Sequence, residues 1–129
     1  MICADTPVWI AALRDADGPA ARHLGELMDA DQVLLPTFVR LELLAGARPK
    51  DLAGLRELLS ALPQAVPDAG TWRRIEEWIA VAAGRSQRFG VGDLLIAASA
   101  ADHEAPIWSL DGDFARMEKL GLVTRYAVV

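Results

Sequence analysis

The chain has 129 residues, which fits a single domain. If a chain of this length were divided between two cores, neither core could bury enough apolar surface. Charged residues interrupt every apolar run before the roughly 18 residues that a membrane helix needs, and the N-terminus has no basic leader, so we expect a cytoplasmic protein. A formal charge of −5 argues against an ordinary basic nucleic-acid surface but does not exclude nucleic acid, because a nuclease can reach phosphates through bound divalent cations.

Short apolar runs that end at a polar residue or a proline predict buried strands. The first run, residues 2–4, ends at Asp5, and the second, residues 32–35, ends at Pro36. Further strands are expected at residues 64–66, 106–110 and 123–129.

Apolar residues spaced three or four apart predict helices between these strands. Thr6 and Pro7 begin the first helix, and Thr37 is expected to be the N-cap of a helix that closes at Gly46. The other helices are expected at residues 19–30, 52–62, 72–83, 93–103 and 114–120.

Four or five apolar strands separated by helices favour a parallel sheet, because parallel neighbours need crossover connections. The expected fold class is therefore α/β, with three α/β/α layers around a parallel four- or five-stranded sheet. No repeat or linker interrupts the sequence, so residues 1–129 are expected to form one domain.

Acidic residues occupy the strand ends and the helices that follow them. Asp5 ends the first strand, Glu42 lies in the helix after the second, Asp93 opens an apolar helix, and Asp111 and Asp113 follow the strand at 106–110. Such positions converge outside the carboxyl ends of the strands in open parallel sheets. Carboxylates brought together repel unless protons or cations neutralise them, and oxygen ligands suit Mg²⁺ or Mn²⁺. No comparable set of basic residues accompanies these acids. The pattern therefore predicts a divalent-metal site.

Each acid also has a purely structural explanation. Asp93 could be a helix N-cap, while Asp111 and Asp113 could form an Asx turn. Glu42, expected to face inward from its helix, could instead pair with a neighbouring arginine such as Arg40. Taken singly, the three aspartates favour the structural explanation, but their combination with Asp5 and Glu42 favours a metal site.

Four sequence blocks surround these acids: DTPVWI at 5–10, RLELLAG at 40–46, GVGDLLIAASA at 90–100 and WSLDGDF at 108–114. In this order they resemble the PIN-domain ribonucleases, particularly the VapC toxins of bacterial toxin–antitoxin pairs. Any one block is weakly specific. Four blocks in this order and at these separations, over nearly the whole chain, are fairly specific for the family. The resemblance implies a PIN-like fold for the single domain.

The resemblance further implies a metal-dependent ribonuclease, in which Mg²⁺ or Mn²⁺ promotes hydrolysis of an RNA phosphodiester bond. Thr6 and Ser109 keep hydroxyl groups beside the first and last acids, where they would orient ligands or water. The implied metal and catalytic ligands are Asp5, Glu42, Asp93 and Asp111, with Asp113 as an additional or alternative metal ligand.

A polar loop before Asp93 is a candidate RNA contact. Arg85, Gln87 and Arg88 in this loop could hold RNA phosphates, although a solvated loop explains them equally well.

Partner proteins are expected as well. The resemblance implies a cognate VapB-like antitoxin, and apolar side chains on helices expected to be exposed favour a homodimer. These side chains are Leu52, Leu55, Trp72 and Trp78.

Two other functions remain open at this point. A receiver-like phosphoacceptor domain has a similar length, but it needs a lysine after a late strand, and neither Lys50 nor Lys119 ends a strand. A non-catalytic protein-binding module predicts no specific stabilisation by divalent ions.

Overall fold

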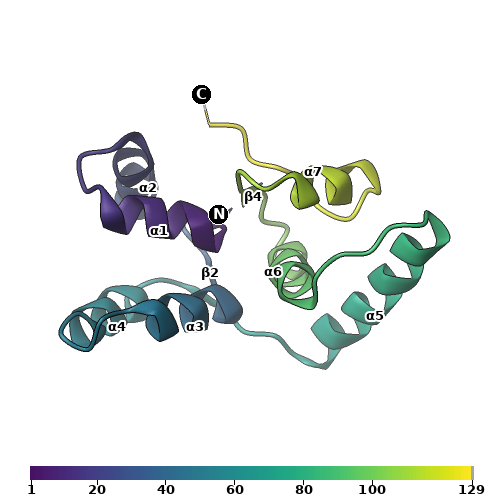
Figure 1. Cartoon of the computed structure of the whole chain (residues 1–129), viewed down its shortest axis with the longest axis horizontal. Coiled ribbons are helices and arrows are strands. Elements are labelled where there is room, and N and C mark those ends of the chain that lie inside the picture. Colours follow the sequence, from purple (N-terminus) through teal and green to yellow (C-terminus); the bar gives the residue numbers. More distant parts are fainter. Residues whose placement is uncertain (129) are drawn as a thin grey trace.

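In residues 1–128, which the computed structural model describes, helices predominate and the strands are short (Figure 1). None of these helices is long and apolar enough to cross a membrane. The helices are α1 (Thr6–Arg14), α2 (Pro19–Asp29), α3 (Thr37–Gly46), α4 (Leu52–Ser60), α5 (Ala69–Gly84), α6 (Val91–Asp102) and α7 (Gly112–Lys119). The strands are β1 (Cys3–Ala4), β2 (Leu35–Pro36), β3 (Gln64–Ala65) and β4 (Ile107–Trp108).

All of the described strand pairing is parallel. β1 pairs with β4, and β2 pairs with β3. A single bridge between Ile2 and Val33 joins the two pairs, and a second bridge links Ile107 to Arg125. The segments therefore lie in the order β3, β2, β1, β4 and the stretch around Arg125, which confirms the predicted α/β class with parallel strands.

The strands are shorter than predicted: α1 and α3 begin almost directly after β1 and β2, and three irregular residues separate β3 from α5 and β4 from α7. The predicted strand at residues 123–129 is reduced to the bridge at Arg125, since its partner β4 is itself only two residues long. Val129, the last residue of that predicted strand, lies outside the described residues.

The N-termini of α1 and α3 are capped in different ways. Asp5 is the N-cap of α1, where its Oδ1 accepts a hydrogen bond from the Thr6 backbone N–H at 2.8 Å. The prediction that Thr37 caps α3 is wrong, because Pro36 holds the cap position and Thr37 is already helical. The Thr37 hydroxyl instead donates to the Ala65 carbonyl oxygen at 3.2 Å, which ties α3 to β3.

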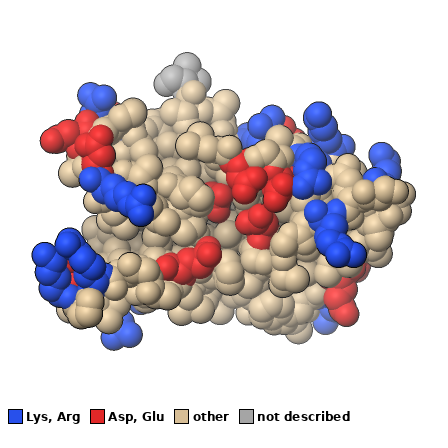
Figure 2. Space-filling view, in the orientation of Figure 1, with Lys and Arg blue, Asp and Glu red and all other residues tan. Residues whose placement is uncertain are grey.

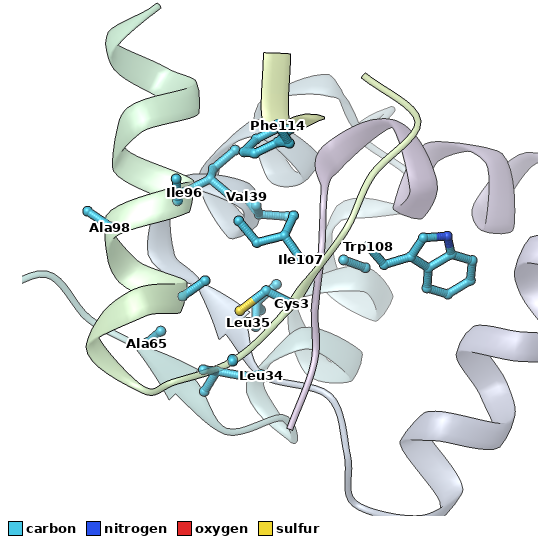
Figure 3. Close-up of a cluster of buried hydrophobic side chains, with 14 of the residues drawn as sticks. Cys3, Leu34, Leu35, Val39, Ala65, Ile96, Ala98, Ile107, Trp108 and Phe114 are labelled. Atoms are coloured by element: carbon cyan, nitrogen blue, oxygen red, sulfur yellow. The ribbon is translucent and has the colours of Figure 1, made fainter. Parts of the chain in front are cut away.

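A single apolar core surrounds the strands. In the close-up of this core, α6 runs along one side of the strands, and Trp108 projects toward the helices on the other side, in keeping with the predicted layers (Figure 3). Small side chains such as Ala97 and Ala98 are fully buried and let α6 approach the strands closely. Phe114 is also fully buried, so it anchors α7 to the same core.

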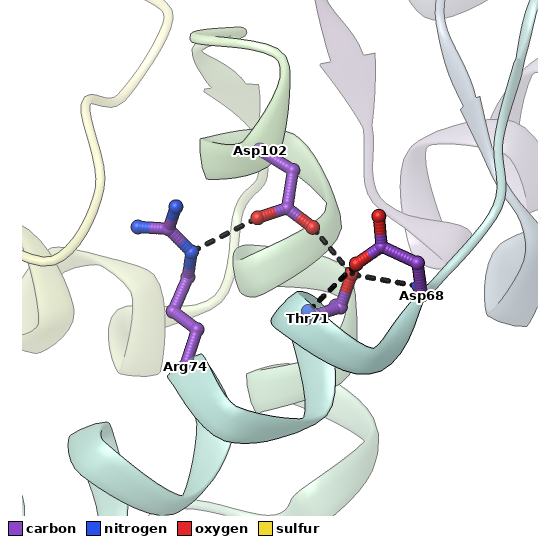
Figure 4. A network of polar contacts seen from close by, with 4 residues as sticks. All are labelled: Asp68, Thr71, Arg74 and Asp102. Carbon is purple, nitrogen blue, oxygen red and sulfur yellow. Dashed lines mark hydrogen bonds and ion pairs between the residues drawn. The ribbon is translucent and has the colours of Figure 1, made fainter.

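The two ends of α6 are fixed by different contacts. At its start, a Cβ added to Gly92 would lie 2.9 Å from ring atoms of Phe38, so the absence of a side chain lets α6 pack against α3. At its end, Asp102 accepts hydrogen bonds from the Thr71 hydroxyl and from Arg74 Nε, and both donors belong to α5 (Figure 4). The first turn of α6, which carries Asp93, is thereby held in a defined place.

Candidate metal centre

Asp5 is the most buried acid of the candidate site. It is 3% exposed and lies directly after β1. One carboxylate oxygen caps α1, and the other accepts a hydrogen bond from Ser109 Oγ at 2.9 Å. Burial raises the pKa of Asp5, the hydrogen bonds from Ser109 and Thr6 oppose this shift, and the nearby carboxylates of Asp111 and Glu42 add to it. Asp5 is thus rigidly held with its charge only partly compensated.

Glu42 reaches the site through a neighbour of Asp5. The Thr6 hydroxyl donates to Glu42 Oε1 at 2.6 Å. The expectation that Glu42 faces inward is wrong: α3 buries Val39 and Leu43, which leaves Glu42 exposed at the edge of that face. No ion pair involves Glu42 within residues 1–128, and the alternative partner Arg40 donates to other groups.

Asp93, Asp111 and Asp113 form a cluster, here called the acid cluster, in which one carboxylate oxygen from each lies within 4.8 Å of the other two. Asp93 is the third residue of α6, and because Gly90 is the N-cap, the capping explanation for Asp93 is wrong. Asp111 does cap α7, where its Oδ1 accepts the Asp113 backbone N–H at 2.9 Å. The first turns of two helices therefore present their carboxylates to each other.

Burial and the neighbouring acids act on Asp93 in the same direction. Burial raises the pKa of Asp93 to about 6, and the negative charges of Asp5, Asp111 and Asp113 contribute to the same shift. A divalent cation would relieve this repulsion as a proton does.

Ser109 connects the buried acid with the acid cluster. Its Oγ donates to Asp5 and accepts the backbone N–H of Asp111 at 3.0 Å. On the face shown in Figure 2, acidic side chains gather in the middle and basic side chains flank them. The structure thus brings the predicted aspartates together through short contacts, while Glu42 is joined to them through Thr6 next to Asp5.

Basic residues also lie close to the site. The loop predicted to contact RNA directly precedes α6 in the sequence, and Arg116, which was not predicted, contacts Asp113. Arg85 and Arg88 are exposed in the loop between α5 and α6. The sequence interpretation missed Arg116, whose Nη2 donates to Asp113 Oδ1 at 2.6 Å. The i, i+3 spacing of Asp113 and Arg116 on a predicted helix was the available signal.

Residues 2–120 match the family model of the PIN domain. The chain belongs to the PIN-domain family. This finding removes the receiver-like alternative, and PIN domains are generally nucleases that use divalent metal ions.

Solved structures with the same PIN fold cover the chain almost completely. VapBC2 from Rickettsia felis, bound to a DNA fragment from its promoter, matches at a TM-score of 0.79 and 18% identity, over 98% of each chain. FitAcB from Neisseria gonorrhoeae matches at 0.71 and 20% identity, over 98% of this chain and 97% of the other. VapBC-5 from Mycobacterium tuberculosis, a member of the VapBC family of toxin–antitoxin systems, matches at 0.69 and 25% identity, over 98% of each chain.

The donor set of this PIN domain suits a hard divalent cation. The acid cluster offers carboxylate oxygens only, which are typical ligands of Mg²⁺ and Mn²⁺ and poor ligands for soft metals. Because the oxygens already lie within 4.8 Å of one another, an ion between them requires little rearrangement.

Proposed function

We propose that residues 1–129 form one PIN domain that acts as a ribonuclease dependent on Mg²⁺ or Mn²⁺, in which Asp5, Glu42, Asp93 and Asp111 carry the reaction. The observation that supports this proposal most directly is the acid cluster, with its short oxygen separations and the raised pKa of Asp93. Perturbed carboxylates in this arrangement are typical of metal-assisted phosphodiester chemistry.

Each residue has a role that follows from its contacts. A bound divalent ion would lower the pKa of a coordinated water and stabilise negative charge at the phosphate. Asp93 and Asp111 would supply anionic oxygens to the ion, and Asp5 would supply one from the buried side. Ser109 orients the Asp5 carboxylate, and Thr6 orients that of Glu42, by the hydrogen bonds described above.

RNA would approach across the exposed loop between α5 and α6. Arg85 and Arg88 are free to contact phosphates because neither side chain has a described ion pair in residues 1–128. The phosphate nearest the acid cluster would be held mainly by the metal, because the surrounding carboxylates repel it.

We also propose that the domain is the toxin of a toxin–antitoxin pair. A groove of about 820 Å³ lies between α1, α3 and α4, and apolar side chains such as Ile10, Leu43 and Leu55 line it. Glu42 lies in the lining of the same groove. An antitoxin segment with an apolar face and an Arg or Lys beside Glu42 would fit both features and would block the metal site.

A homodimer is the expected state of the free protein. Trp72 and Ile79 on α5 are 51% and 47% exposed, and Leu52 on α4 is 37% exposed. Trp78 does not contribute, because it is buried against the core at 7% exposure, and Leu55 is only partly exposed because it packs against the same core. Light scattering at tens of micromolar should give twice the chain mass of 13.9 kDa, whereas a monomer mass would contradict the dimer.

Divalent metal should stabilise the fold and switch on RNA cleavage. A ligand that binds only the folded state stabilises it by about 2.7 kcal/mol at a concentration one hundred times its Kd. We therefore expect millimolar Mn²⁺ to raise the melting temperature, EDTA to reverse the rise, and a structured RNA pool to be cleaved only with Mn²⁺ or Mg²⁺. Equal melting curves in Mn²⁺ and EDTA, with no cleavage, would favour the non-catalytic binding module instead.

A further inference from the structure

The acid cluster has a basic neighbour that the proposed function does not use. Arg116 follows Asp113 by three residues on α7, and its Nη2 donates to Asp113 Oδ1 at 2.6 Å. Its Nη1 donates to Gln87 Oε1 at 3.4 Å, and the guanidinium carbon lies 4.6 Å from the centre of the Phe89 ring. Gln87 and Phe89 belong to the loop between α5 and α6, so one side chain connects this loop with a carboxylate of the cluster.

These contacts exceed those of an ordinary surface pair on a helix. An exposed i, i+3 pair joins two flexible side chains and contributes little to stability. Arg116 instead packs against Phe89, which is only 6% exposed. The planar guanidinium of Arg116 is therefore held against a fixed aromatic ring. The other close neighbours of the Asp113 carboxylate are the acids Asp93 and Asp111. Among the described ion pairs, that of Arg116 is the one that brings positive charge to the cluster.

We propose that Arg116 is a positioning residue with two linked tasks: it is the counter-ion of Asp113 in the metal-free site, and it holds residues 87–89 beside the acid cluster for RNA. The second task rests on the proposed ribonuclease function, whereas the first does not. The two tasks have opposite consequences. The guanidinium charge opposes a divalent ion at Asp113, while its contacts with Gln87 and Phe89 favour RNA binding.

Metal binding without RNA tests the first task. The melting temperature would be measured at increasing Mn²⁺ concentrations for four purified proteins: the wild type, Arg116→Ala, Arg116→Lys and Arg125→Ala. Removing one positive charge a few ångströms from the ion should lower about fivefold the Mn²⁺ concentration that gives a fixed rise in melting temperature in Arg116→Ala. Arg116→Lys keeps the charge and should titrate like the wild type. A purely structural role predicts the reverse, because a loosened site binds Mn²⁺ more weakly.

Arg125→Ala is the matched control. Arg125 pairs with Glu118 at 3.1 Å, and the two side chains are 48% and 38% exposed, close to the 42% and 34% of Arg116 and Asp113. Glu118 does not belong to the acid cluster. Arg125→Ala should therefore leave the Mn²⁺ titration unchanged, and an equal shift in this control would attribute the effect to net charge and overturn the assignment to Arg116.

RNA kinetics test the second task. Lysine cannot reproduce the fork to Asp113 and Gln87 or the flat contact with Phe89, so both Arg116 variants should raise KM for RNA about tenfold, with kcat within about threefold of the wild type. Unchanged KM in both variants would overturn the loop task. Unchanged or weaker Mn²⁺ binding in Arg116→Ala would overturn the counter-ion task. A wild type that cleaves no RNA would refute the proposed function and the loop task with it, while the Mn²⁺ comparison would still decide the counter-ion task.

Discussion

Replacing Asp93 by Asn should reduce RNA cleavage by at least about a hundredfold while the fold persists. Asn keeps the size of the side chain but removes one anionic metal ligand. No helix cap is lost, because Gly90 and not Asp93 holds the N-cap position of α6. The measurement is cleavage of a structured RNA pool by both proteins in Mn²⁺ or Mg²⁺, with a cooperative melting transition in EDTA as the check on the fold.

The same variant should change how the stability of the metal-free protein depends on pH. The pKa of Asp93 is about 6 in the folded protein against the usual 3.8, so folding takes up a proton between these values. Stability therefore falls as pH rises from about 4 to 6, and the loss remains at higher pH. Asp93→Asn removes this contribution, so in EDTA the variant should be the more stable protein at pH 7.5 and lose that advantage by pH 4.

Two outcomes would contradict this account of Asp93. Cleavage at the wild-type level would remove Asp93 from the reaction. A variant that melts below the wild type in EDTA at pH 7.5 would show that repulsion within the acid cluster does not destabilise the folded state. Glu57→Gln is a suitable control, because Glu57 is exposed on α4 and does not belong to the acid cluster.

Phe114→Ala should cost about 3–5 kcal/mol of folding free energy, the usual range for an aromatic side chain removed from a packed core. Phe114 is fully buried, and its helix α7 starts with the cap Asp111 and carries Asp113. A loss of this size is a large fraction of the stability of a small domain. Urea unfolding in EDTA measures it.

The effect on cleavage should exceed the loss of folded protein, because an unanchored α7 no longer holds two acids in the cluster. Phe114→Leu is the matched control, and it should cost less than about 2 kcal/mol because it keeps most of the apolar contact. If Phe114→Ala unfolds at the urea concentration of the wild type, the core does not anchor α7. A folded Phe114→Ala protein with normal cleavage would show that the position of Asp111 and Asp113 does not depend on this contact.

Local pattern was enough to predict the type and order of the elements. The runs at residues 2–4 and 32–35 lack a helical period, and Asp5 and Pro36 end them, so these strands could be placed along the chain directly. Their lengths could not be predicted, because a strand ends where its partner ends, and the partner of β1 lies about one hundred residues away. The last predicted strand was overextended for this reason.

The candidate acids were also visible in the sequence, because Asp5 and Asp111 follow strands and the carboxyl ends of parallel strands meet at one edge. Which groups distant in sequence touch was decided by tertiary structure. Thr6 meets Glu42 across 36 residues, Ser109 meets Asp5 across 104, and Arg116 meets Gln87 across 29. Residue type and spacing determine what a side chain offers over a few neighbouring positions, whereas contacts at these separations depend on how the helices pack around the strands.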